Sequence, residues 1–242
     1  MSMLQSMKRR SWLLVPASRP DEVEQAASSG ADVVVLDFSE FVAPRDKAAA
    51  RARAAAMIDS LHARGVQVFA QTDSVAMTED VGACVRAGLS GIVLSRAESA
   101  QQVRCLSAML DTREAASRLP RGAIAIVPSL ETARGNRDGY DIACASTRVW
   151  GLTPGRADLV MDLRPEPSGE LHLMPYLMQR LVIVAGAAGK VPLGAWWRAP
   201  DRGLLATPEN TYQAGVRGRA IGFRGAMCLL PAQVKALNEA YA

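Results

Sequence analysis

Few features of the 242-residue sequence favour a thiolate metal site, a disulfide framework or a membrane anchor. The four cysteines are scattered along the chain, with no C-x-x-C pair and no neighbouring histidine, which excludes a recognisable zinc site. Such spacing is typical of reduced thiols and indicates a cytoplasmic protein. No apolar run approaches the roughly 20 residues that cross a bilayer, so we expect no membrane partner.

Lysine and histidine are scarce as well. The 28 basic residues are almost all arginines, and these are spread along the whole chain. The net charge of +4 therefore has no cluster that would attract a polyanion, and we expect no nucleic-acid partner. His62 falls in the polar part of a long helix and is interpreted as a surface residue. His172, in the loop after Asp158, is also interpreted as a surface residue, with a position at the mouth of the fold predicted below as the alternative.

Short apolar runs alternate with polar, alanine-rich segments along the chain. The hydrophobic content of 49% is enough for a large core. Continuous β-branched runs such as ADVVVLDF are typical of strands that are buried on both faces. The expected strands span residues 11–16, 31–38, 66–71, 91–95, 123–128, 148–152, 191–196 and 226–231. The expected helices span residues 21–29, 46–63, 78–87, 98–118, 175–188, 208–219 and 231–241.

This alternation predicts an α/β fold, a (β/α)8 TIM barrel that forms one domain over residues 1–242. Strands that alternate with helices favour a parallel sheet with helical crossovers, and about eight units in roughly 250 residues are typical of the closed barrel. A doubly wound open sheet is the alternative. Its dinucleotide-binding version has less support, because no G-x-G-x-x-G follows the first strand.

The carboxyl ends of the strands converge on one mouth in a barrel. This geometry would bring together Asp37, Ser39, Glu40, Gln71, Arg96, Glu131, Asp158 and Leu230. Glu131 and Asp158 follow two consecutive strands, whose ends would lie about 5 Å apart if the strands are parallel neighbours. Two carboxylates so placed can share one Mg²⁺. The alternative is a pair of ordinary acids that are solvated or cap helices.

Six segments carry a resemblance to a known family through their order and spacing. They are RSWLLVPASRP, GADVVVLDFSEFVAPRDKAAAR, SRAESAQQV, PSLETARG, GLTPGRADLVMDL and GFRGAMCLLPAQVKALNEAY. Together they resemble the citrate lyase β-subunit-like (CitE-like) proteins of the HpcH/HpaI aldolase superfamily. The resemblance implies a (β/α)8 barrel of the phosphoenolpyruvate/pyruvate-domain type that makes or cleaves a carbon–carbon bond next to a carbonyl.

The resemblance also implies a cofactor, a set of ligands and an assembly. The cofactor would be Mg²⁺ or Mn²⁺, and the family's two metal-binding acids fall on Glu131 and Asp158. A bound cation would stabilise an enolate oxyanion. Backbone amides after Gly155, at Arg156 and Ala157, could hold a substrate carboxylate. Asp37, which ends a buried strand, is a further candidate for substrate binding, and the alternative is that it orients neighbouring backbone or an arginine. Relatives are commonly trimers or hexamers.

The chain departs from the family pattern at four positions near the expected mouth. Ser39, with Glu40 beside it, replaces an acid, and Gln71 stands nearest to the place of an arginine on the third strand. Arg96 replaces a lysine and keeps the charge, whereas Leu230 replaces a histidine. The loss of one fixed positive charge at a developing anion typically costs several kcal/mol. Either the chemistry of this chain differs from that of its relatives or its site is impaired.

We predict a metal-dependent carbon–carbon lyase that acts on a short oxo acid or a hydroxyacyl thioester, with Arg96, Gln71, Ser39 and Glu40 as catalytic residues. Because the family's third-strand arginine is missing here, we expect an oxo acid to be a better substrate than an acyl-CoA. A barrel that has lost turnover and serves as a ligand-binding or assembly subunit is the alternative. A homo-oligomer is expected, and Val234, Leu237 and Tyr241 form an apolar stripe on the last helix that could dock on a neighbour.

Overall fold

The computed structural model describes the backbone of residues 8–155, 170–195 and 207–242, and their side chains except those of residues 170–174 and 195. The strands in these residues are β1 (Ser11–Pro16), β2 (Val33–Asp37), β3 (Gln67–Thr72), β4 (Leu89–Leu94), β5 (Ala125–Leu130), β6 (Gly151–Pro154), β7 (Val191–Pro192), β8 (Gly194–Ala195) and β9 (Ala226–Cys228). Every pair of neighbouring strands is parallel. Their order along the sheet is β7-β6-β5-β4-β3-β2-β1-β9-β8.

The sheet closes on itself through the short segment that contains β7 and β8. Only Leu193 separates these two strands, so they are halves of one extended segment. Its first half pairs with β6, where Val191 lies opposite Gly151, and its second half pairs with β9, where Gly194 lies opposite Ala226. The ring therefore has eight strand positions, and the predicted (β/α)8 barrel is confirmed.

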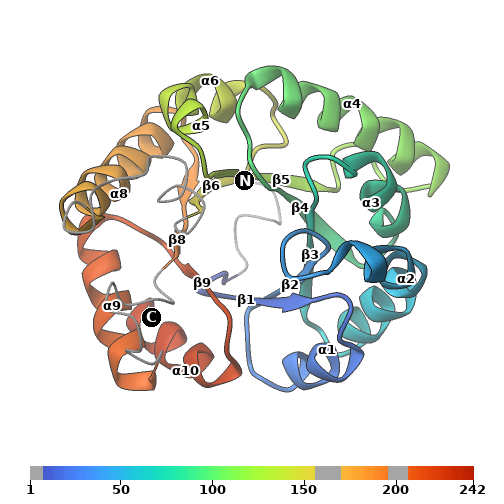
Figure 1. Ribbon diagram of the computed structural model, residues 1–242, viewed down its shortest axis with the longest axis horizontal. Coiled ribbons are helices and arrows are strands. Elements are labelled where there is room, and N and C mark those ends of the chain that lie inside the picture. Colours follow the sequence, from blue (N-terminus) through green and yellow to red (C-terminus); the bar gives the residue numbers. More distant parts are fainter. Residues whose placement is uncertain (1–7, 156–169, 196–206) are drawn as a thin grey trace.

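The helices surround the ring of strands on the outside (Figure 1). They are α1 (Pro20–Ala27), α2 (Lys47–Ala63), α3 (Met77–Cys84), α4 (Ala100–Ala116), α5 (Ala133–Arg137), α6 (Gly139–Cys144), α8 (Glu170–Ala187), α9 (Pro208–Ile221) and α10 (Pro231–Ala240), and the 3-10 turn η2 (Pro44–Asp46) precedes α2. Local sequence sets several of their ends. Ser99 and Gln102 form a capping box at the start of α4, and Gly222 ends α9 with φ at 116°.

The helices differ from the predicted ones in two places. No helix was assigned from the sequence between residues 128 and 148, where α5 and α6 lie. They are too short to show a helical repeat of apolar residues, and the Thr132 hydroxyl, which accepts a hydrogen bond from the Gly135 amide, is the clearest local signal for α5. The helix expected to begin at Pro175 begins at Glu170, so that Pro175 lies inside α8.

The core has an inner and an outer part. Inside the barrel lie alternate residues of the strands, including Trp12, Val35 and Phe69. Gly91 leaves room for the Phe69 ring, because a Cβ at this glycine would lie 2.2 Å from a ring carbon. The outer part lies between the strands and the helices and is the larger cluster. All residues of β2 are buried, as the continuous apolar run predicted.

The apolar stripe of α10 belongs to this outer core and not to a docking surface. Val234 and Leu237 are each 1% exposed, and both pack within the larger cluster. The prediction that this stripe docks on a neighbouring subunit is therefore wrong. The hydrophobic side chains that are well exposed lie elsewhere, for example Tyr176 and Ile183 on α8, which are 59% and 70% exposed.

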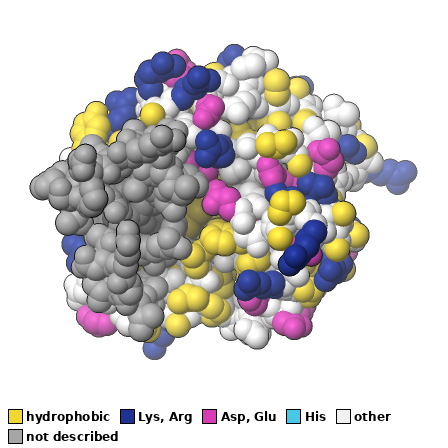
Figure 2. All heavy atoms as spheres, in the orientation of Figure 1, with side chains coloured by type: hydrophobic (Ala, Val, Ile, Leu, Met, Phe, Trp, Pro, Cys, Tyr) yellow, Lys and Arg dark blue, Asp and Glu magenta, His cyan; other side chains and the backbone are white. Residues whose placement is uncertain are grey.

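Charged side chains of both signs are interspersed over the coloured part of the face shown in Figure 2. Within the described ranges, no helix combines the length and the hydropathy that a bilayer crossing requires.

Candidate active site

The inward-facing side chains change from apolar to polar at the carboxyl ends of strands β2 to β6. Val35 and Phe69 lie in the inner core, and because side chains alternate along a strand, Asp37 and Gln71 two residues later also face inward. The same alternation from Val93 and Val127 places Ser95, Ser129 and Glu131 inside. These polar side chains are all buried, with Asp37 0%, Gln71 7% and Glu131 3% exposed. The barrel mouth is therefore lined with hydrogen-bonding groups.

Asp37, Ser39 and Gln71 form a chain of hydrogen bonds across the ends of β2 and β3. The Ser39 hydroxyl donates to Asp37 Oδ1 over 2.5 Å, and Gln71 Nε2 donates to Ser39 Oγ over 2.9 Å. Asp37 also accepts hydrogen bonds from the backbone amides of Ser39 and Phe41. Three of the predicted site residues are thus brought into direct contact.

Burial dominates the ionisation of Asp37. Removal from water raises the pKa of this carboxyl group above its usual value, and the hydrogen bonds from Ser39 and Phe41 and the charge of Lys47 oppose the rise. Lys47, at the start of α2, is itself ion-paired with Asp73 in the loop after β3. This pair joins the loops that follow β2 and β3 at the mouth.

Glu131 follows β5 directly and lies against the end of β6. A Cβ built at Gly155, just after β6, would lie 1.8 Å from Glu131 Cγ and 2.7 Å from its Cδ. Only glycine leaves space for the Glu131 side chain at this point. Gly155, predicted to bind the substrate, is thus next to Glu131, and its binding role stays a prediction. The other predicted residues of this segment, Arg156, Ala157 and Asp158, lie outside the described residues.

The Gly155→Ala variant is expected to be less stable than the wild type by about 1–3 kcal/mol, because the added methyl group overlaps the Glu131 side chain. Urea denaturation followed by circular dichroism measures the loss. Gly186→Ala is the matched control, since a Cβ there meets no atom within 4 Å and alanine favours the α8 helix. Equal stability of Gly155→Ala and wild type would contradict the contact.

Asn136 holds the backbone on both sides of Glu131 and was not predicted from the sequence. Its Nδ2 donates to the carbonyl oxygens of Leu130 and Thr132, over 3.1 and 3.0 Å. Arg180 of α8 donates in turn to the Asn136 carbonyl. Asn136 is 7% exposed. Because its two hydrogen bonds fix the backbone before and after Glu131, it acts as a positioning residue for Glu131. A polar residue at the fourth position of a helix of five residues gave no sequence signal for this role.

Arg96 follows β4 with a backbone conformation that is unusual for a residue other than glycine. Its φ is 48°, in the left-handed region. The residues on both sides are anchored, since Ser95 Oγ donates to the Thr72 carbonyl and the Ala97 amide donates to the Ser129 carbonyl. The Arg96 side chain is exposed, and no acid of the described chain forms an ion pair with it. Its charge is thus available to a ligand.

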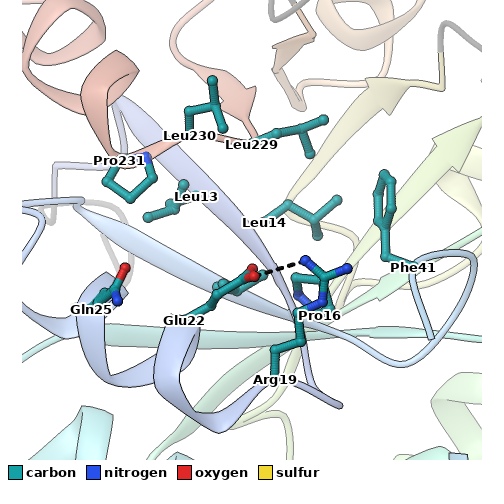
Figure 3. Close-up of a pocket in the computed structure, with 11 residues that line it drawn as sticks. Leu13, Leu14, Pro16, Arg19, Glu22, Gln25, Phe41, Leu229, Leu230 and Pro231 are labelled. Atoms are coloured by element: carbon teal, nitrogen blue, oxygen red, sulfur yellow. Dashed lines mark hydrogen bonds and ion pairs between the residues drawn. The ribbon is translucent and has the colours of Figure 1, made fainter. Parts of the chain in front are cut away.

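The remaining predicted residues have more exposed positions. Glu40 is exposed beside Ser39, and Leu230, at the start of α10, is 49% exposed. Leu230 borders an apolar cavity of about 360 Å³ beside the mouth (Figure 3). The cavity lies between the end of β1, helix α1 and the β9–α10 segment, and Phe41 also lines it. Its most polar part is the ion pair between Arg19 and Glu22.

The donor set at the mouth suits a hard divalent cation. Glu131 supplies carboxylate oxygens in a buried position, and Gly155 leaves the adjacent space open to its side chain. Within the described residues, no group of three or more histidine, cysteine or acidic side chains is arranged around a metal position. A cation held by one or two carboxylates and completed by substrate or water oxygens is the arrangement typical of Mg²⁺.

Comparison with known proteins agrees with this geometry. The family description HpcH/HpaI aldolase/citrate lyase matches residues 10–231. A citrate lyase subunit beta-like protein of Mycobacterium tuberculosis is 29% identical, over 95% of this chain and 78% of the relative. An L-malyl-CoA/beta-methylmalyl-CoA lyase of Cereibacter sphaeroides is also 29% identical, over 96% of this chain and 78% of the relative.

Solved structures show the same architecture. The citrate lyase beta subunit of M. tuberculosis complexed with oxaloacetate and magnesium has a TM-score of 0.74 and 25% identity, and the match covers 99% of each chain. A malate synthase of Haloferax volcanii has a TM-score of 0.81 at 18% identity, over 98% of this chain and 74% of that one, which shows a shared fold. The motifs, the closed barrel and the family match over residues 10–231 establish that the chain belongs to the HpcH/HpaI aldolase/citrate lyase family.

Proposed function

We propose that this protein is a Mg²⁺- or Mn²⁺-dependent carbon–carbon lyase that acts on a short oxo acid. The observation that carries the proposal is the buried Glu131 carboxylate at the polar mouth of the barrel, with Gly155 packed against it. The relative from M. tuberculosis that was solved with oxaloacetate and magnesium supports both the metal and the class of substrate. The lyase activity in the names of the curated relatives supports the type of reaction.

Each residue at the mouth has a proposed task. Glu131 and Asp158 would hold the cation, which supplies positive charge for an oxyanion that develops on the substrate. Arg96, whose charge faces solvent at the mouth, orients an anionic group of the substrate. Asp37 and the backbone of Gly155, Arg156 and Ala157 bind the substrate.

The neutral side of the mouth favours an oxo acid over an acyl-CoA substrate. Ser39 and Gln71 carry no charge and bond to each other, so the end of β3 offers no cation to a thioester enolate. The absence of one preorganised donor typically lowers the rate by about 10²–10³. Glu40 is exposed beside this pair and is proposed as a further catalytic acid or base. An oxo acid can chelate the metal with its own carboxylate and needs less help from the protein.

Proton exchange at pyruvate tests the function. The purified protein with Mg²⁺ or Mn²⁺ is expected to exchange the methyl protons of pyruvate, or the methylene protons of oxaloacetate, with solvent deuterium, as followed by NMR. A chelator should abolish the exchange. Malyl-CoA and citryl-CoA should be cleaved at least about a hundredfold more slowly than a typical relative cleaves them. Absence of metal-dependent exchange, or rapid cleavage of either thioester, would contradict the proposal.

A catalytically impaired barrel that binds a ligand or serves in an assembly is the second candidate. The uncharged Ser39–Gln71 pair and the apolar Leu230 favour it, because neither supplies an acid, a base or a fixed charge. Binding of oxaloacetate with Mn²⁺ but without proton exchange would identify this function.

We also propose a cytoplasmic location and a homo-oligomer, a trimer or a hexamer. All four cysteines are free thiols, and burial raises the pKa of Cys228 to about 12, so this thiol is not reactive. The exposed Tyr176 and Ile183 side chains of α8 offer apolar surface for association between copies.

A further inference from the structure

We propose that the Gln71 side-chain amide, oriented by Ser39 and Asp37, selects a substrate that carries a neutral hydrogen-bonding group, a carboxamide or a hydroxyl, where a dicarboxylic oxo acid carries its second carboxylate. This inference rests on the proposed oxo-acid function and narrows the class of substrate. Gln71 is thus a specificity-determining residue.

Asp37 determines which way the Gln71 amide points. The Asp37 carboxylate accepts hydrogen bonds, and Ser39 gives it the only proton of its hydroxyl group, over 2.5 Å. The Ser39 oxygen can then only accept from Gln71. The Gln71 amide must therefore direct Nε2 to Ser39, over 2.9 Å, and its Oε1 away from Ser39.

This orientation leaves two hydrogen-bonding functions of Gln71 for a ligand. Within the described residues, the side-chain amide makes the single hydrogen bond to Ser39. Its Oε1 can accept one hydrogen bond, and its second N–H can donate another. A carboxamide or a hydroxyl matches this combination, because each both donates and accepts. A carboxylate only accepts, so it would leave Oε1 facing another lone pair.

The charges around Gln71 also disfavour a carboxylate. Asp37 is the next group along the hydrogen-bond chain and is fully buried. Lys47, whose charge acts on Asp37, already forms an ion pair with Asp73. A second carboxylate at Gln71 would thus meet a buried acid, and the described residues of β2 and β3 offer it no cation. Arg96, which follows the neighbouring β4, is the proposed partner of the other carboxylate, the one next to the carbonyl. Like charges in a poorly solvated site repel each other.

One small ligand can reach both Gln71 and Glu131. The two residues lie on β3 and after β5, which are separated by β4 alone. Two strand spacings are about 10 Å, and both side chains point inward and shorten this gap. The carboxylate–carbonyl end of an oxo acid can therefore face Glu131 while its other end faces Gln71.

A matched pair of ligands tests the inference by calorimetry on the full chain with Mn²⁺. Oxaloacetate and its 4-amide, 2-oxosuccinamate, differ only in the carboxylate or carboxamide at the distal end. The wild type is expected to bind the amide about tenfold more tightly, which corresponds to one hydrogen bond of ordinary strength. Gln71→Arg should invert the preference, whereas Gln213→Arg, the same substitution on the exposed surface of α9, should leave it unchanged.

A third variant tests the orienting role of Ser39. Ser39→Ala frees the Gln71 amide to rotate, so the preference for 2-oxosuccinamate should fall to about twofold or less. A merely structural effect of the substitution would weaken the binding of both ligands equally. Tighter binding of oxaloacetate by the wild type, or binding of neither ligand, would overturn the inference. Exchange of the pyruvate methyl protons is measured in parallel. Proton exchange without a preference for 2-oxosuccinamate overturns this inference alone, whereas absence of proton exchange in the wild type overturns the proposed function.

Discussion

Replacing Arg148 by methionine is expected to lower the free energy of unfolding by about 3–5 kcal/mol. The Arg148 side chain is 5% exposed and donates to both carboxylate oxygens of Glu114, which is 1% exposed. Glu114 also accepts hydrogen bonds from the backbone amides of Gly122 and Ile124. Without the guanidinium group a buried carboxylate loses its counter-charge at the start of β5. Urea denaturation measures the effect.

Arg121→Met is the control for this substitution. Arg121 pairs with Asp111, a neighbour that Arg148 also contacts, but the Arg121 side chain is 84% exposed. Exposed pairs are worth little, so the control should lose less than about 1 kcal/mol. Equal losses in the two variants would show that burial of the Arg148–Glu114 pair does not stabilise the barrel as inferred here.

The stabilisation by Arg148 should depend on pH. Hydrogen bonds from Arg121 and Arg148 lower the pKa of Asp111 from 3.8 to about 2. Burial acts against ionisation of Glu114, but its hydrogen bonds from Arg148 and the backbone hold its pKa below the usual 4.5. Carboxyl groups with a lowered pKa in the folded state stabilise it above their unfolded pKa and lose this effect as pH falls. The difference in free energy of unfolding between the wild type and Arg148→Met should therefore become smaller as the pH falls from 4.5 towards 2.

The Glu131→Gln variant is expected to lose metal-dependent proton exchange by at least about 10²-fold. Glutamine keeps the volume of the side chain beside Gly155 but removes the charge that would hold the cation. Exchange of the pyruvate methyl protons at fixed Mn²⁺ measures the loss, and circular dichroism checks that the barrel is folded.

Glu98→Gln is the matched control for the change of charge. Glu98 is a partly buried acid in the loop after β4, with Arg134 at 4.0 Å, and it has no proposed role in metal binding. It should keep exchange within about threefold of the wild type. If the two variants lost activity to the same degree, the general negative charge of the mouth and not Glu131 itself would be responsible.

The barrel could be predicted because its strands carry strong signals. The run over residues 33–36 is continuously apolar and begins with three β-branched valines, which is typical of a strand buried on both faces. The helices α5 and α6 could not be predicted in the same way, because segments of five and six residues are held by caps and tertiary packing and not by a periodic apolar face. The stripe of α10 shows a further limit. An amphipathic pattern does not say whether it faces its own core or a partner.

The site could be predicted in part. The convergence of Asp37, Ser39 and Gln71 follows from strand ends in a barrel, and the structure brings them into one hydrogen-bond chain. The bond between Ser39 and Gln71 depends on side-chain rotamers and strand register, which the sequence does not reveal. The role of Asn136 depends on the short turn of α5. The predicted metal ligand Asp158 lies outside the described residues and stays a prediction.

Calorimetric titration of Mn²⁺ into the wild type and the Glu131→Gln variant tests the central claim, that Glu131 at the barrel mouth holds the catalytic cation. We expect the wild type to bind one Mn²⁺ per chain and the variant to bind it at least about a hundredfold more weakly. Mutation of a residue that only orients a metal ligand already lowers metal affinity by about 10–100-fold, and Glu131 is a proposed ligand itself. Equal affinity of the two proteins for Mn²⁺ would contradict the claim.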